Sequence, residues 1–120
     1  MKRDTLALRV VAVFLLGAGL YHLVGALAPT FAPRLPTWRH GLFAAVDLVA
    51  AVGLWRDFRG FSLLFAVLTA QQLWSHGGDL LRAATVHHRL DALSLVVVLL
   101  MPGALALVLR RARGHTPPTV

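Results

Sequence analysis

Four side chains that can do acid–base or ligand chemistry fall on one stripe of a long apolar segment. Thr69, Gln72, His76 and Asp79 are spaced i, i+3, i+7 and i+10 within the stretch TAQQLWSHGGD. At roughly 100° per residue, this spacing keeps them within about 80° of one another on a helix. Polar groups are costly on an apolar helix, so the stripe predicts contact with another helix, a ligand or water.

Two more ionisable residues, His22 and Asp47, interrupt other apolar runs. Each shares a helix face with small residues that let helices approach closely: Ala18, Gly25 and Ala26 for His22, and Ala44, Ala50 and Ala51 for Asp47. An ionised aspartate in hydrocarbon costs ~2.5 to 3.5 kcal/mol on insertion scales. Asp47 therefore needs water, a proton or a partner, which His22, His76 or an arginine of an outer loop can supply.

Imidazole and carboxylate side chains together suit three kinds of ligand. Both bind transition metals, neutral histidine binds haem iron, and a histidine bonded to an aspartate exchanges protons with a quinone head group. The candidate metal ligands are His22 and His76, although no metal motif of known spacing is present. The candidate ligand-binding residues are His22, Asp47, Gln72, His76, Asp79 and Asp91. The cofactor stays open among a quinone, a haem and a metal ion, and the sequence does not decide whether there is catalysis.

Each of these groups also has a purely structural interpretation. An Asp47–His22 pair can lock two helices together, and Thr69 and Gln72 can form hydrogen bonds between helices. His76 and Asp79 can form a hydrated helix end. The pair His87-His88, followed by Asp91, can be an exposed turn at the membrane interface.

Composition indicates a membrane protein. The 120 residues are 58% hydrophobic, with a mean hydropathy of +0.71, which is too apolar for a soluble core of this size. The net charge of +7 comes from cations beside apolar runs, which favours lipid head groups over nucleic acid. Cysteine is absent, which excludes disulfides and thiol redox chemistry.

Hydropathy and turn signals predict an all-α, four-helix membrane bundle in one domain over residues 1–113. The first apolar run follows a basic start and is expected to be a retained span rather than a cleaved signal. Pro29, Pro33 and Pro36 make a connector after it. Asp79 is expected to cap a short interfacial helix, unless the third helix continues past Gly77-Gly78. The expected spans are about 5–27, 39–56, 61–76 and 90–109, and residues 114–120 are expected to be a disordered tail.

Basic residues are distributed unequally between the two expected sides of the membrane. The side with both termini holds eight: Lys2, Arg3, Arg9, Arg56, Arg59, Arg110, Arg111 and Arg113. The other holds four: Arg34, Arg39, Arg82 and Arg89. The positive-inside rule then places both termini in the cytoplasm. Because the candidate residues lie in the other half of the bundle, we expect an outward-facing pocket.

The first 60 residues resemble the small DoxX-like membrane proteins of bacteria. The resemblance lies in RVVAVFLLGAGLYHLVGAL and in GLFAAVDLVAAVGLW, which ends at a basic turn. Where this chain has Asp47, those proteins usually carry Glu. The resemblance implies four spans in the bacterial inner membrane and a redox or quinone connection, and it assigns no catalytic residue.

Three functions are compatible with this pattern. The first is a redox or ligand-binding membrane protein whose outer His/Asp pocket binds a quinone, haem or metal. The second is an accessory subunit of a larger membrane complex, in which the polar stripe meets another chain. The third is a small transporter assembled as a homo-oligomer, which would need polar residues in the inner half as well; that half has almost none.

Overall fold

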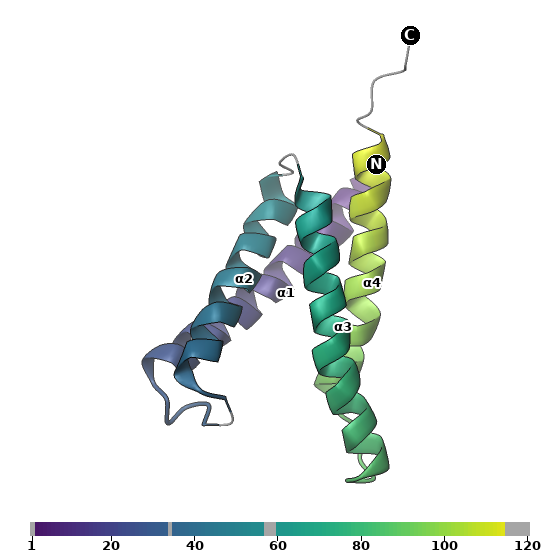
Figure 1. The fold of residues 1–120 in the computed structure, drawn as a ribbon. Coiled ribbons are helices and arrows are strands. Elements are labelled where there is room, and N and C mark those ends of the chain that lie inside the picture. Colours follow the sequence, from purple (N-terminus) through teal and green to yellow (C-terminus); the bar gives the residue numbers. More distant parts are fainter. Residues whose placement is uncertain (1, 34, 57–59, 115–120) are drawn as a thin grey trace. The chain divides into compact units, whose positions relative to one another are not determined.

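The computed structural model describes residues 2–33, 35–56 and 60–114, and every regular element in these ranges is a helix (Figure 1). The four helices are α1 (Lys2–Leu27), α2 (Thr37–Arg56), α3 (Phe61–Thr85) and α4 (Ala92–Arg113). The predicted all-α class with four helices is confirmed. The predicted tail, apart from Gly114, lies outside the described residues.

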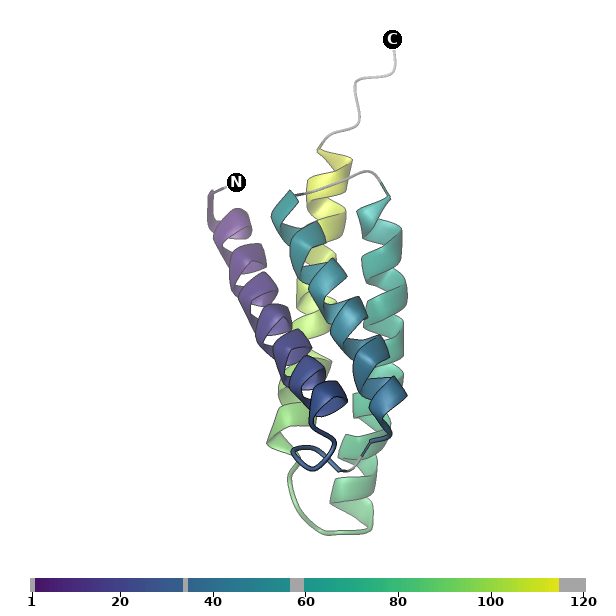
Figure 2. The ribbon, with the colours of Figure 1, turned by 90° about the vertical axis from the view of Figure 1, so that its left-hand side faces the viewer.

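The chain divides into two compact units, Met1–Phe58 and Arg59–Val120. Each is a pair of antiparallel helices that pack side by side: α1 with α2 in the first hairpin, and α3 with α4 in the second (Figures 1 and 2). The predicted single domain over residues 1–113 stays a prediction.

Proline shapes the connection in the first hairpin. Helix α1 ends at Leu27, just before the proline-rich connector of residues 28–36. Pro36 has no N–H to donate, but its carbonyl accepts hydrogen bonds from the backbone amides of Arg39 and His40. This arrangement begins α2 directly after the last proline.

Glycine allows α1 and α2 to approach closely. A Cβ atom added at Gly25 would lie 2.9 Å from two atoms of the His40 ring, and one added at Gly19 would lie 3.0 Å from Leu48. Two residues of α1 therefore have no room for a side chain because α2 occupies that space. Gly25 was expected to lie on the close-packed face of His22, and this is confirmed.

Helix α3 is longer than the sequence indicates. It begins after Gly60, whose φ of 80° is left-handed and suits glycine, and continues through Gly77 and Gly78 to Thr85. Of the two alternatives left open, the structure has the one in which the helix continues past Gly77-Gly78, so Asp79 lies inside α3 instead of capping a new helix. Glycine lowers helix propensity by about 1 kcal/mol but does not forbid a helix.

The segment after Thr85 folds back against the last turns of α3. The amides of Val86 and His87 donate to the carbonyl of Arg82, and the amide of Arg89 donates to that of Ala83. His88 has a φ of 48°, a left-handed conformation in which histidine is enriched. The helix thus stops at Thr85, before His87-His88, and His88 helps to form the reversal.

Apolar residues at helical spacing hold the second hairpin together. Helix α3 buries Phe61, Phe65 and Leu68, and α4 buries Val97 and Met101. Asp91 is the N-cap of α4, where its side chain accepts a hydrogen bond from the Ser94 amide. Pro102 lies within α4 and leaves the carbonyl of Val98 without its helical donor.

Two helices in the described part of the chain are long and apolar enough to cross a membrane, namely Arg3–Leu27 and Ala92–Arg113. Helices α2 and α3 have 20 and 25 residues, enough for a hydrocarbon core of ~30 Å at 1.5 Å per residue. Their polar residues, such as Asp47 and His76, lower their hydropathy.

The contact between Gly25 and His40 leads to a stability prediction. Replacing Gly25 with alanine places a methyl group against a buried ring that two hydrogen bonds hold in place. We expect Gly25→Ala to lower the unfolding free energy by about 1 to 3 kcal/mol, as overpacking does. Thermal unfolding in detergent micelles measures the change.

Gly17 provides the matched control on the same helix. A Cβ atom there has no neighbour within 4 Å, and alanine favours the helix by about 1 kcal/mol. Gly17→Ala should therefore be neutral or stabilising. Equal effects of the two substitutions would contradict the packing of α1 on α2.

Candidate functional site

The first hairpin contains a pair of hydrogen-bonded imidazoles. His22, near the end of α1, and His40, in the first turns of α2, have their Nδ1 atoms 2.9 Å apart. The Nε2 atom of His40 lies 3.0 Å from the carbonyl oxygen of Ala32 in the connector. The pair thus joins α1, α2 and the segment between them.

This geometry fixes the tautomers of the neutral pair. A carbonyl oxygen can only accept, so His40 carries its proton on Nε2 and donates it to Ala32. The His40 Nδ1 atom then has a lone pair and accepts the Nδ1–H of His22. In this neutral pair the proton of His22 is therefore on Nδ1.

Aromatic rings surround the two imidazoles. The Tyr21 ring lies 5.4 Å from that of His22 and 6.3 Å from that of His40, between ring centroids. The ring of Phe43 lies 5.2 Å from that of His22. His40 is 2% exposed, whereas His22 is only half-buried. The His40 ring is therefore held inside the hairpin, whereas the His22 ring reaches the surface of the hairpin.

The second hairpin contains a chain of three polar side chains. The Ser94 hydroxyl donates to Asp91 Oδ2 at 2.8 Å, and the Ser94 amide donates to Asp91 Oδ1 at 3.1 Å. The His76 Nδ1 atom of α3 lies 3.0 Å from the Ser94 hydroxyl oxygen. The chain thus joins a histidine of α3 to the carboxylate that caps α4.

The direction of these bonds determines their chemistry. Because the Ser94 hydroxyl gives its proton to Asp91, its oxygen must accept from His76, which therefore carries a proton on Nδ1. His76 cannot act as a base toward Ser94 in this arrangement, which argues against a serine nucleophile. In the neutral ring, Nε2 is then the nitrogen that carries the lone pair.

Asp91 is held in its ionised form. The Ser94 amide, and after it the Ser94 hydroxyl, lower the pKa of the Asp91 carboxyl from its ordinary value. A lowered pKa means that the cap is present at neutral pH and is lost only as the pH falls through that lower value. The carboxylate therefore supports His76 throughout the neutral range.

Asp47 takes no part in either of these hydrogen-bonded groups. It is 3% exposed on α2, and the described residues offer its carboxyl no hydrogen bond or ion pair. The hydrogen bond of His22 goes to His40 and not to Asp47. The predicted pairing of His22 with Asp47 is therefore not formed.

The remaining predicted residues take lesser roles in this geometry. Thr69 donates its hydroxyl to the carbonyl of Phe65 in its own helix, so its predicted bond between helices is wrong. Gln72 is half-buried and Asp79 is exposed. The described residues include no group of three or more histidine and carboxylate ligands suited to a metal ion. A metal held by His22 and His76 stays a prediction, because they belong to different units.

Two important residues, His40 and Ser94, were missed among the candidates. His40 shares a helix face with Ala44 and Asp47, at i, i+4 and i+7. Helical spacing alone could therefore have placed His40 on the same face of α2 as Asp47. Ser94 follows Asp91 by three positions, as in an N-terminal cap. Their partners could not be found, because each lies 18 residues away across a hairpin.

Comparisons with protein-family models, with curated proteins and with solved structures find no match. The resemblance of the first 60 residues to small DoxX-like proteins therefore stays a prediction. What the chain does is inferred from its own residues.

The tautomers are directly measurable. In ¹⁵N-histidine-labelled protein at neutral pH, the neutral form of His76 should carry its proton on Nδ1 and that of His40 on Nε2, because of the acceptors that each faces. Long-range ¹H–¹⁵N correlation spectra distinguish the two forms.

Ser94→Ala removes the hydroxyl oxygen that accepts the hydrogen bond from His76. The neutral His76 ring should then no longer prefer to carry its proton on Nδ1. His40 should be unaffected and serves as the internal control. A neutral His76 with its proton on Nε2 in the unsubstituted protein would contradict the proposed direction of the chain.

Proposed function

We propose that the chain is a multi-pass membrane protein in which all four helices cross the bilayer. Only 28% of the apolar window of α1, and the same share for α4, is buried within the protein. Large apolar side chains such as Leu63 and Leu99 are 72% and 68% exposed. So much apolar surface favours a lipid surrounding.

Tryptophan and arginine near both ends of α2 support its assignment as a span. The Arg39 guanidinium lies 5.7 Å from the centre of the Trp38 ring, and that of Arg9 lies 5.5 Å from the centre of the Trp55 ring. Trp38 and Trp55 are about 25 Å apart along the helix at 1.5 Å per residue. Such a separation suits two interfacial belts on either side of a hydrocarbon core.

The excess of Lys and Arg on the side of the termini favours cytoplasmic N- and C-termini. This orientation places both hairpin connections, and the histidines near them, on the outer side. Together with the resemblance to small DoxX-like proteins, it suggests the bacterial inner membrane.

Cysteine labelling tests the orientation, because the chain has no cysteine of its own. In intact cells, an impermeant maleimide should label Thr37→Cys and His87→Cys, which lie at exposed positions of the outer connections. It should label Thr5→Cys and Gly114→Cys only after the membrane is permeabilised. The reverse pattern would place the histidines on the cytoplasmic side.

For the ligand, we propose a quinone-type head group that contacts His76. The observation that carries this proposal is the chain from Asp91 through Ser94 to His76. Neutral His76 accepts a proton from a quinol hydroxyl at Nε2, and protonated His76 donates from the same atom to a quinone carbonyl. The same Nε2 atom therefore suits both ligand states.

The position of His76 also suits a ligand that arrives from the bilayer. The residue is half-buried, and Trp74, two positions earlier on α3, is 87% exposed. Positions two apart lie on nearly opposite faces of a helix, so Trp74 supports a lipid surrounding for α3 and is not itself a wall of a His76 site.

Equilibrium binding of a short-chain ubiquinone analogue to the purified protein tests this ligand. We expect saturable binding that His76→Ala weakens about tenfold, which corresponds to one lost hydrogen bond of ~1.4 kcal/mol. His87→Ala, at an exposed position of the same hairpin, should bind like the unsubstituted protein.

The quinone proposal would be overturned if the analogue merely partitioned into micelles without saturation, to the same extent with the unsubstituted protein, His76→Ala and His87→Ala. A specific chain that then co-purifies stoichiometrically would support the accessory-subunit function instead.

A further inference from the structure

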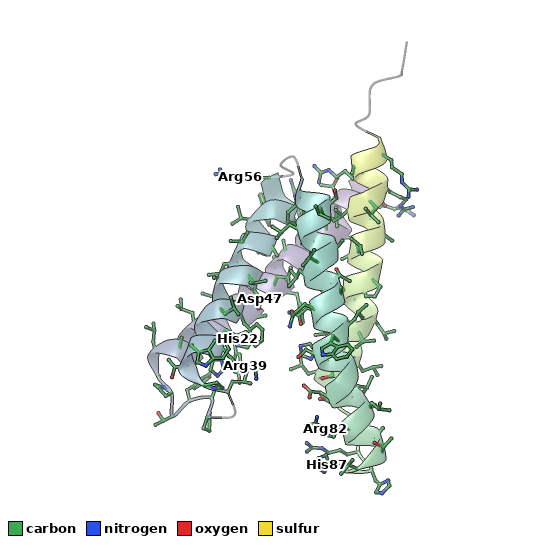
Figure 3. The ribbon with its side chains drawn as sticks, in the orientation of Figure 1. His22, Arg39, Asp47, Arg56, Arg82 and His87 are labelled. Carbon is green, nitrogen blue, oxygen red and sulfur yellow. The ribbon has the colours of Figure 1, made fainter. Side chains whose placement is uncertain are left out.

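At the end of the first hairpin that is opposite to the proline-rich connector, a cation lies over an exposed indole ring. The Arg9 guanidinium of α1 lies 5.5 Å from the centre of the Trp55 ring of α2. Trp55 is 57% exposed, and both Arg9 and Arg56, the next residue of α2, are exposed as well. Figure 3 shows Arg56 at this end of the hairpin and Arg39 at the other. This end therefore presents an aromatic ring and two arginines to its surroundings.

The contacts along the hairpin show that α1 extends past the end of α2. Gly25 of α1 faces His40 of α2, and Arg9 faces Trp55, so the two contacts are about equally far apart along both helices. Because α2 ends at Arg56, residues 2–8 of α1 extend beyond it by about 10 Å at 1.5 Å per residue. Arg9 therefore lies at the level at which α2 ends.

The contact with Trp55 does not use the hydrogen-bond donors of Arg9. A cation–π contact is an attraction between the ring and the charge, whereas a guanidinium also carries five N–H donors in its plane. Among the described residues, none forms a hydrogen bond or an ion pair with Arg9. The described part of the hairpin thus leaves these donors to water or to an anion.

The charge and the residue types at this end suit a phosphate group. Arginine binds phosphate through two parallel N–H···O bonds, and tryptophan favours the headgroup level of a bilayer. The first unit carries four basic and two acidic residues near this end, an excess of positive charge: Lys2, Arg3, Arg9, Arg56, Asp4 and Asp57. An anionic ligand complements this excess.

Exposed apolar side chains continue from the two arginines along each helix. On α1, Val13 and Leu16 follow Arg9 at i+4 and i+7, and both are exposed. On α2, exposed Val52 precedes Trp55 by three positions. An acyl chain can lie along these residues while its headgroup stays at Arg9. The combination of a cationic end and an apolar surface favours a phospholipid over a soluble phosphate.

We propose that Arg9, Trp55 and Arg56 bind the phosphodiester headgroup of an anionic phospholipid. Arg9 donates N–H bonds to the phosphate oxygens, Trp55 holds the Arg9 guanidinium at the level of the headgroups, and Arg56 adds a second positive charge. The proposal rests on the proposed membrane location of α1 and α2, but not on the quinone ligand.

Fluorescence quenching in lipid vesicles tests the proposal. The chain has three tryptophans, so Trp38→Phe together with Trp74→Phe leaves only Trp55. The vesicles contain phosphatidylglycerol and phosphatidylcholine, and either of the two lipids carries bromine on its acyl chains, which quenches a nearby tryptophan. We expect phosphatidylglycerol to be preferred at Trp55 by about fivefold, the size expected for one arginine near an anionic lipid.

Arg9→Gln, in the same single-tryptophan protein, tests the role of the guanidinium. Glutamine cannot form the charged pair with phosphate, so the preference should fall below about twofold. Arg82→Gln is the matched control. It removes the same charge at an exposed position of the second hairpin, close to the connection between α3 and α4, and should leave the preference unchanged (Figure 3).

Two results would overturn the lipid site while leaving α2 in the membrane. One is equal quenching of Trp55 by the two brominated lipids. The other is an equal loss of preference in Arg9→Gln and Arg82→Gln, which would assign the preference to net charge alone. If neither brominated lipid quenched Trp55, the residue would lie outside the bilayer, and the proposed membrane location would fail together with the lipid site.

Discussion

A histidine in an apolar helical hairpin needs a hydrogen-bond partner, and in this protein each hairpin provides one internally. His40 is 2% exposed and donates to the backbone carbonyl of Ala32, while His22 completes the pair from α1. In the second hairpin, His76 is held by Ser94, which is held by Asp91. Leaving such a group unpaired in an apolar interior costs about 1 to 3 kcal/mol. This requirement determines which helix faces meet, and it places both polar groups toward the connections of their hairpins.

Asp47 departs from this rule. It is buried on the packed face of α2, yet no described side chain or backbone group bonds to its carboxyl. Natural proteins break a local rule of this kind mainly at functional sites, where the cost is offset elsewhere. Gly19 and Gly25 bring α1 close to this face.

Much of the helical architecture was predictable from the sequence, because apolar length, prolines and glycines act locally. The prolines at 29, 33 and 36 were correctly expected to separate two helices, and Gly60 lies directly before α3. The sequence left the end of α3 open because Gly77 and Gly78 weaken a helix without forbidding it, and the helix in fact continues to Thr85. The pairing of polar residues was harder to foresee. Helical periodicity gives the face of His22, but only the packing of α1 on α2 decides that His22 bonds to His40 and not to Asp47.

Helix α2 is proposed to cross the bilayer in spite of Asp47. Spin labels at Thr37, Leu42 and Val49, which are exposed positions along α2, test it most directly in lipid vesicles. Collision with dissolved oxygen should be greatest for the label at Val49, near the bilayer centre, and collision with a water-soluble nickel chelate should be greatest at Thr37. A label at Val49 that the nickel chelate reaches as easily as it reaches Thr37 would show that α2 lies in water, and would contradict the account.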